Sequence, residues 1–128
     1  MSNYSMRKQV ETSFDETVLL VREALHREGF GVLTEINVSA TLKKKLDVNY
    51  PNYLILGACH PASAYAALTS DKEIGLLLPC NVVIYEENNA VVVSAIRPTV
   101  GLQIADKNAV APIASEVEAK MQRVMNQI

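Results

Sequence analysis

A stripe of apolar residues at helical spacing follows Ser13 and ends before Gly29. Its members lie three or four positions apart and are Phe14, Val18, Val21 and Leu25. Ser13 is the expected N-cap of a helix, with Glu16 three residues later as its capping-box partner. Gly29 suits the position after the last turn because glycine accepts a left-handed backbone. The pattern therefore predicts a well-bounded amphipathic helix between Ser13 and Gly29.

A second stripe of the same kind fills the C-terminal end of the chain. Apolar residues recur there every three or four positions, namely Val110, Ile113, Ala114, Val117, Met121, Val124, Met125 and Ile128. Proline is tolerated only in the first turn of a helix, so Pro112 places the helix start near residues 108–110. The final segment is therefore predicted to be a long helix with charged residues on its other side.

Between the two helices lie segments with the composition of strands. With the segment before Ser13 they number five: residues 4–11, 30–36, 53–58, 82–87 and 90–96. The last two flank Asn88-Asn89, and two residues that tolerate positive φ between β-branched runs predict a hairpin. Residues 53–58 are apolar on both faces, which indicates a central strand that is covered on both sides or faces a partner subunit. Gly57 in this strand indicates that another group approaches the backbone closely.

The connections contain shorter helical signals. Ser39 is the expected cap of a short helix over residues 40–46, and Pro61 is placed as the first residue of a helix over residues 61–70. Residues 99–107 fit either a loop or a short helical turn. Together the elements predict one α+β domain over residues 1–128. The domain should consist of a mainly antiparallel sheet of about five strands, with the two long helices packed on one face.

Composition narrows the class of protein. The chain has 128 residues, of which 49% are hydrophobic, enough for the core of one domain. Its 12 basic and 14 acidic residues give a net charge of -2, which argues against nucleic-acid binding because such proteins carry a surplus of Lys and Arg. No apolar run reaches membrane-spanning length, and residues 1–8 lack the apolar centre of a signal peptide. Two cysteines do not make a disulfide scaffold, so we expect a cytoplasmic protein with reduced thiols.

Candidate chemistry gathers where a strand-like run meets a helix-like run, at Gly57-Ala58-Cys59-His60-Pro61. If Pro61 opens a helix, His60 lies at its N-cap and Cys59 immediately before it. The unpaired N–H groups and the positive end of the helix dipole would then favour a thiolate and lower the pKa of Cys59. The alternative is a small buried thiol at the end of a strand, since free cysteine is among the most buried residue types.

The second cysteine, Cys80, follows Pro79 at the mouth of a later strand. If the two strands are neighbours, Cys59 and Cys80 lie close together as a redox pair, as ligands of a soft metal such as zinc, or as unrelated core residues. A metal site would use Cys59, His60 and Cys80, because catalytic zinc needs three protein ligands. Their spacing is not a recognised zinc pattern. Moreover, Cys59 and His60 can share an ion only across a turn.

Four stretches resemble the bacterial and archaeal family called domain of unknown function 302. They are Phe14-Asp15-Glu16-Thr17-Val18, Gly29-Phe30-Gly31-Val32-Leu33, Gly57-Ala58-Cys59-His60-Pro61 and Gly75-Leu76-Leu77-Leu78-Pro79-Cys80. The likeness covers nearly the whole chain, and His60 stands where the family more often has Asn. The resemblance implies a curved antiparallel sheet like that of the TATA-binding protein, in the order β-α-β4-α with helices on one side, and a homodimer. It implies no activity, because none is established for the family.

Three functions follow from these residues. The first is a small cytoplasmic binding or sensor module, with Cys59 and Cys80 in a cleft for a soft metal ion, a thiol-reactive molecule or a small hydrophobic ligand. The lack of a recognisable acid–base constellation favours this module over catalysis. The second is a thiol-dependent enzyme or redox protein, with Cys59 as nucleophile and Cys80 as resolving thiol or His60 as base. The third is a structural or interaction protein whose cysteines are packing residues.

Overall fold

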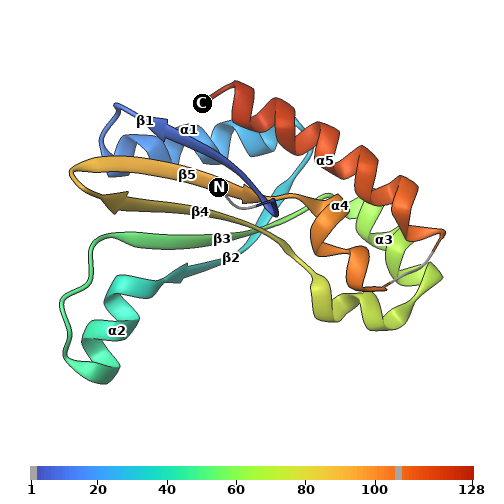
Figure 1. Ribbon diagram of the computed structural model, residues 1–128, viewed down its shortest axis with the longest axis horizontal. Helices are drawn as coiled ribbons and strands as arrows, with labels where there is room; N and C mark the ends of the chain where they lie inside the picture. Colours follow the sequence, from blue (N-terminus) through green and yellow to red (C-terminus); the bar gives the residue numbers. More distant parts are fainter. Residues whose placement is uncertain (1–2, 106–107) are drawn as a thin grey trace.

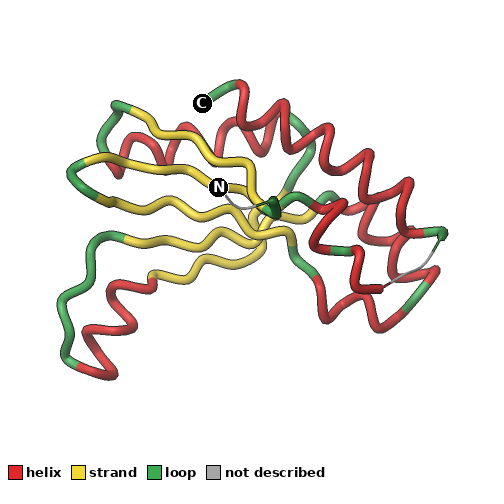
Figure 2. Tube along the Cα trace, in the orientation of Figure 1, coloured by secondary structure: helices red, strands yellow, loops and turns green. Residues whose placement is uncertain are grey.

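Five strands form one antiparallel sheet (Figures 1 and 2). The structure is a computed structural model that describes residues 3–105 and 108–128. In chain order the strands are β1 (Ser5–Val10), β2 (Gly31–Asn37), β3 (Tyr53–Cys59), β4 (Cys80–Glu87) and β5 (Ala90–Ile96). Their spatial order is β1-β5-β4-β3-β2, and every neighbouring pair is antiparallel. The predicted sheet is confirmed, with β3 and β4 as neighbours.

Two long helices, α1 (Phe14–Arg27) and α5 (Val110–Asn126), pack on one face of the sheet (Figure 1). The core between these layers consists of fully buried aliphatic side chains, among them Val21, Leu25, Leu56, Val82, Ile84, Met121 and Val124. Burying one side chain of this size contributes about 1.5–3 kcal/mol. Both predicted stripes therefore face the sheet, and the α+β architecture is confirmed.

Local capping explains where α1 begins and ends. The Ser13 hydroxyl accepts a hydrogen bond from the Glu16 N–H at 3.1 Å, as the capping pattern predicts. Gly29 has a φ of 85°, the left-handed conformation expected after the last turn. At the other predicted turn, Asn88 and Asn89 have φ values of 53° and 63° and join β4 to β5 as a hairpin.

One of the two predicted short helices differs from expectation in its boundaries. Helix α2 (Val38–Leu46) begins earlier than predicted, because the Asn37 side chain caps it by accepting from the Ala40 N–H at 2.9 Å. Ser39, the predicted cap, instead donates its hydroxyl to the carbonyl of Pro51. The helix buries none of its residues, and Leu46 is 66% exposed.

The remaining helices gather at the end of the sheet where β3 stops and β4 starts (Figure 2). They are α3 (Pro61–Ser70), α4 (Pro98–Gly101) and the 3₁₀ helices η1 (Lys72–Leu77) and η2 (Gln103–Ala105). The ambiguous segment 99–107 is thus mainly helical, and residues 106–107 lie outside the described residues. Among the described helices, none has both the length and the apolarity needed to cross a membrane.

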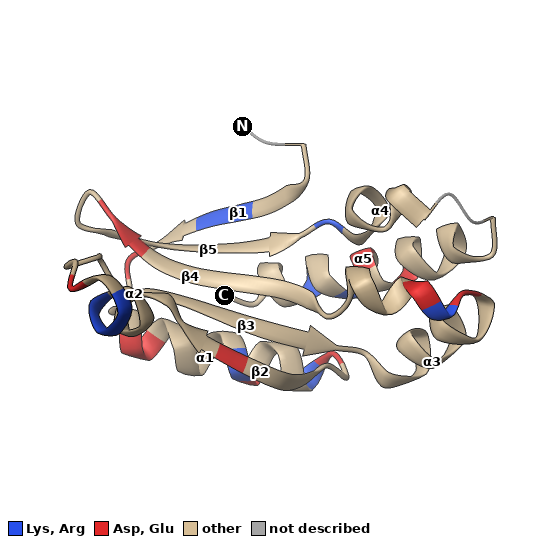
Figure 3. Ribbon diagram, turned by 90° about the horizontal axis from the view of Figure 1, so that it is seen from below, with Lys and Arg blue, Asp and Glu red and all other residues tan. Residues whose placement is uncertain are grey.

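The face of the sheet opposite α1 and α5 carries apolar and aromatic side chains. Tyr53 stacks on Tyr85 with ring centroids 5.2 Å apart, and Ile55 lies opposite Val83 in the register. Figure 3 views the molecule from this side, with most of the central strands uncharged. Arg7 on β1 is ion-paired with Glu87 at 3.8 Å. Strand β3 is therefore covered by helices on one face and has an apolar second face.

Candidate functional site

The strand-to-helix corner at Cys59 has the predicted construction. Strand β3 ends at Cys59, His60 is the N-cap of α3, and Pro61 is the first helical residue. Cys80 opens β4 and lies opposite Ala58 in the β3–β4 register. The pairing of the two strands therefore brings the backbones of Cys59 and Cys80 next to each other.

A small cavity lies at this corner, with a volume of about 30 Å³. Cys59, His60 and Cys80 all line it, together with Ser63. The rest of the lining is apolar and comes from β3, α3, α5 and the residues that follow η1 and α4: Ala58, Ala64, Ala67, Leu78, Pro79, Leu102, Ile113 and Val117. The structure thus gathers the three predicted site residues around one space, which we call the thiol cavity.

His60 is held by contacts other than the two sulfurs. Its Nδ1 lies 2.9 Å from the Ser63 hydroxyl oxygen, and its ring meets Phe30 edge-on with centroids 5.6 Å apart. A Cβ on Gly29 would lie 3.3 Å from Nε2, so the ring also packs closely on the turn after α1. These contacts hold the His60 ring in place at the edge of the cavity. Ser63 was not predicted, although it stands at the capping-box position three residues after the cap.

Burial sets the protonation of both thiols. Burial raises the pKa of Cys59 above its ordinary value. Burial and, to a lesser degree, the nearby Cys59 raise the pKa of Cys80 to about 11. The predicted lowering of the Cys59 pKa by the α3 N-terminus is therefore wrong, because desolvation of the thiolate dominates. Both side chains are protonated at neutral pH.

The described residues show neither a disulfide nor a three-ligand metal centre. Cys59 and Cys80 are both free thiols. Over residues 3–105 and 108–128, no group of three or more His, Cys, Asp or Glu side chains is arranged to hold a metal ion. Cys59, His60 and Cys80 therefore share a cavity without forming a three-ligand site. The two cysteines border one space that also has an apolar wall.

Comparisons with known proteins agree with this architecture. No curated protein matches the chain. A solved structure that matches is the "crystal structure of uncharacterized conserved protein DUF302 from Bacillus stearothermophilus", with a TM-score of 0.91 and 28% sequence identity over 98% of each chain. The family model "Domain of unknown function DUF302" matches residues 6–128. The chain therefore belongs to the DUF302 family.

Proposed function

We propose that the protein is a small binding module and that its ligand is a soft metal ion held between the sulfurs of Cys59 and Cys80. The observation that carries this proposal is that two cysteines distant in sequence line the same small apolar cavity. Thiolate sulfur selects soft ions such as Cu(I). A volume of about 30 Å³ leaves room for a single ion, since a cavity of about 10–15 Å³ already holds one water-sized sphere.

A soft ion that accepts two ligands needs no third residue, so His60 can keep its contact with Ser63. Each coordinating thiol releases its proton to solvent, and the raised pKa of both cysteines makes apparent affinity increase with pH. The N-terminus of α3 lies beside Cys59, and the His60 side chain makes no capping hydrogen bond to it. Its positive end therefore favours the negative charge that two thiolates bring.

A metal ion displaces the proton of a buried thiol as it binds, whereas a nucleophilic cysteine must lose that proton unaided. The raised thiol pKa values therefore count more against a thiol-dependent enzyme than against this module. A nucleophilic cysteine acts as a thiolate, and catalytic cysteines have lowered pKa values. In this structure burial raises the pKa of Cys59. The His60 imidazole has Ser63 as its hydrogen-bond partner, so it is not placed as a base for either sulfur. Enzymatic use of Cys59 stays the second candidate function.

Anaerobic titration of the reduced protein with Cu(I), in competition with a chromogenic chelator, tests the proposal. We expect one tightly held equivalent per chain, lost in both Cys59→Ser and Cys80→Ser and kept in the control His60→Asn. Retention of the ion by either cysteine variant would overturn the assignment. A Cys59 thiol that titrates below its ordinary pKa would instead favour the enzyme, and variants that differ only in stability would favour a packing role.

We also propose that a second copy of the chain covers the open face of the sheet. Homodimer interfaces are more apolar than the rest of a protein surface, and this face presents the Tyr53–Tyr85 stack beside Ile55 and Val83. Arg7 on the same face is already paired with Glu87, which lessens the charge presented to a partner.

Sedimentation measurements at micromolar concentration test this dimer. We expect Val83→Lys to yield monomers, because it places a charge at the centre of the apolar face. Leu19→Lys is the matched control, since Leu19 is 62% exposed on α1, which packs on the opposite face. A wild-type monomer, or equal dissociation of both variants, would contradict the proposal.

A further inference from the structure

Helix α2 and the loop that returns from it to β3 form an arm at one end of the sheet (Figure 3). The helix has 9 residues and buries none of them. Its last residue, Leu46, is 66% exposed, and Val48 in the following loop is 42% exposed. Isolated helices shorter than about 12–15 residues are only marginally stable in water, so a helix of this length gains most of its stability from packing. We call residues 38–52 the α2 arm.

The α2 arm is held in a defined shape by its own polar contacts. The Asn37 side chain caps the start of α2, and the Ser39 hydroxyl donates to the Pro51 carbonyl across the loop. Lys43 pairs with Asp47 at 2.8 Å at the other end of the helix. The exposed apolar tip is therefore ordered before any partner arrives, which reduces the entropic cost of docking.

A groove lies at the other end of the sheet, between η1 and α4, with a volume of about 250 Å³. Figure 1 shows η1 and α4 on the same side of the sheet as α2, away from α1. The lining consists mainly of aliphatic and proline side chains, among them Leu76, Leu77, Leu78, Ile96 and Pro98. Leu76 at the rim is 82% exposed. We call this space the η1–α4 groove.

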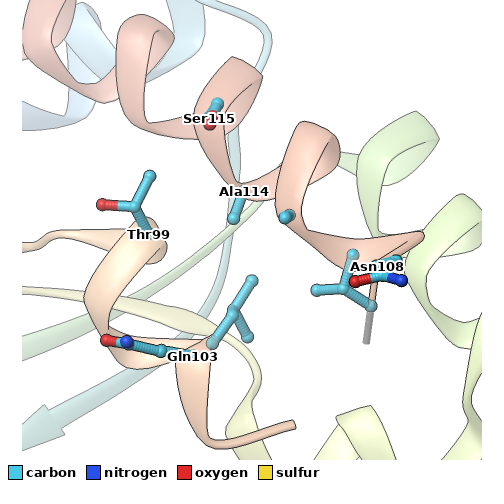
Figure 4. A pocket seen from close by; sticks show the side chains of 8 residues that line it. Thr99, Gln103, Asn108, Ala114 and Ser115 are labelled. Carbon is cyan, nitrogen blue, oxygen red and sulfur yellow. The ribbon is translucent and has the colours of Figure 1, made fainter. Parts of the chain in front are cut away.

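Helix α4 forms one wall of the groove and is fixed to α5. Figure 4 shows Thr99 on the side of α4 that faces α5. The Thr99 hydroxyl donates to Glu118 Oε1 at 2.6 Å, and the Thr99 N–H donates to the same oxygen at 3.0 Å. Arg97, the N-cap of α4, pairs with Glu118 Oε2 at 3.4 Å. The groove is therefore a preformed feature of the single chain.

The groove continues into the open face of the sheet. Asn81 and Ile96 line both the groove and the hollow on that face, which also contains Tyr53, Val83 and Tyr85. The open face thus has the α2 arm at one end and the η1–α4 groove at the other (Figure 3). A partner that covers this face meets an exposed apolar tip at one end and an apolar groove at the other.

The two ends of this surface carry charges of opposite sign. The α2 arm contains the three lysines of residues 43–45 and a single acidic residue, Asp47. At the groove end, η1 is capped by Asp71 and begins with Lys72 and Glu73, so acidic residues are in excess there. Complementary charges across an interface fix its register and disfavour other orientations.

We propose that the α2 arm of one copy docks into the η1–α4 groove of a second copy, with Leu46 in the groove and the lysines beside η1. This inference rests on the proposed dimer and assigns its orientation. A twofold axis that lies between the two open faces and runs perpendicular to the strands turns the second copy end for end. Each arm then meets the partner's groove, and the same contact is made twice.

Photo-crosslinking locates the contact. A benzophenone-bearing amino acid replaces Leu46, and the matched control carries it at Leu19, which is 62% exposed on α1. Mixing isotope-labelled and unlabelled chains identifies crosslinks between copies by mass spectrometry. We expect the probe at Leu46 to react with residues 76–81 or 96–102 of the other copy, and the probe at Leu19 to give no covalent dimer. Crosslinks from Leu46 to another segment would overturn the assignment.

Charge reversal separates this contact from the dimer itself. Lys44→Glu and Glu73→Lys should each raise the dimer dissociation constant about threefold to tenfold in sedimentation at low salt, because a twofold interface loses each attraction twice. The double variant should recover most of the affinity, and the control Glu23→Lys on α1 should not change it. A monomeric wild type would overturn both the dimer and this contact. A dimer that is indifferent to the single reversals, or that the double variant does not restore, would overturn the contact alone.

Discussion

Replacing Gly57 with alanine would place a methyl group where two neighbouring elements meet the backbone of β3. A Cβ at this position would overlap the hydroxyl oxygen of Thr34, which lies opposite Gly57 on β2. The same Cβ would lie 2.7 Å from Cγ of Pro79, far inside ordinary contact distance. The φ angle of Gly57 is not positive, so the substitution is opposed by lack of space and not by backbone conformation.

The two contacts differ in how readily they can relax. The Thr34 hydroxyl can rotate away or be removed, whereas the Pro79 ring is rigid and borders the thiol cavity. Overpacking in a filled site costs about 1–3 kcal/mol. Loss of glycine flexibility in the unfolded chain offsets about 0.4–1 kcal/mol of that. We therefore expect Gly57→Ala to lower the free energy of unfolding by about 1–2 kcal/mol.

Urea unfolding followed by circular dichroism measures this change. Thr34→Ala removes the overlapping hydroxyl and leaves the Thr34 Cβ at 3.5 Å from the new methyl group, so the double variant should regain part of the lost stability. Gly75→Ala is the control, because its Cβ would meet Leu68 at 3.8 Å, an ordinary contact. If Gly57→Ala is as stable as the wild type, or if Thr34→Ala restores nothing, the close approach at Gly57 does not limit side-chain size.

Three further perturbations test the packing around the thiol cavity and α1. The unfolded chain loses the Cys80 proton near pH 9.0, whereas the folded chain loses it only near pH 11. The free energy of unfolding of the wild type should therefore fall by about 2–3 kcal/mol across that pH range. In urea titrations at several pH values, the Cys80→Ala variant should lack this part of the fall. Thr17→Val should lower the free energy of unfolding by about 1–2 kcal/mol, because the buried Thr17 hydroxyl donates to the Ser13 carbonyl at 2.6 Å. Thr17→Ser keeps a hydroxyl at this position and should retain most of that stability. Leu102→Ala should cost about 2–5 kcal/mol in the same assay, because Leu102 is 7% exposed and belongs to a buried apolar cluster beside the thiol cavity. Stability equal to that of the wild type would contradict this packing.

Local chemistry explains the elements that were predicted correctly. The start of α1 depends on Ser13 and Glu16, which are three positions apart. The β4–β5 hairpin depends on two adjacent asparagines that accept positive φ. The start of α3 depends on one proline that has no N–H to satisfy. Each signal is complete within a few residues, so the sequence alone suffices to identify it.

Tertiary contacts explain the boundaries that were misplaced. Asn37 and Ser39 are both residues that cap helices, and the sequence offers no means of choosing between them. The choice follows from the carbonyl of Pro51, which lies across a loop and accepts the Ser39 hydroxyl. Asn37 then caps α2. Sequence reasoning could not decide between a loop and the short helix α4 for a similar reason, because the Thr99 N–H and hydroxyl are held by Glu118, which lies on a helix that starts later in the chain.

At the thiol cavity, sequence reasoning predicted that the two cysteines lie near each other but not the direction in which their pKa values shift. The strand-like character of residues 53–58 and 82–87 was enough to suggest that Cys59 and Cys80 come together, and the β3–β4 register places their backbones side by side. Their protonation depends on what covers the sulfurs, and part of that cover comes from Leu102 and Val117, on later elements. The N-terminus of a helix lowers the pKa of a thiol when the thiolate stays hydrated, but desolvation of the thiolate opposes this effect. The position of the two cysteines was therefore accessible from nearby motifs, whereas the sign of their pKa shift required the completed fold.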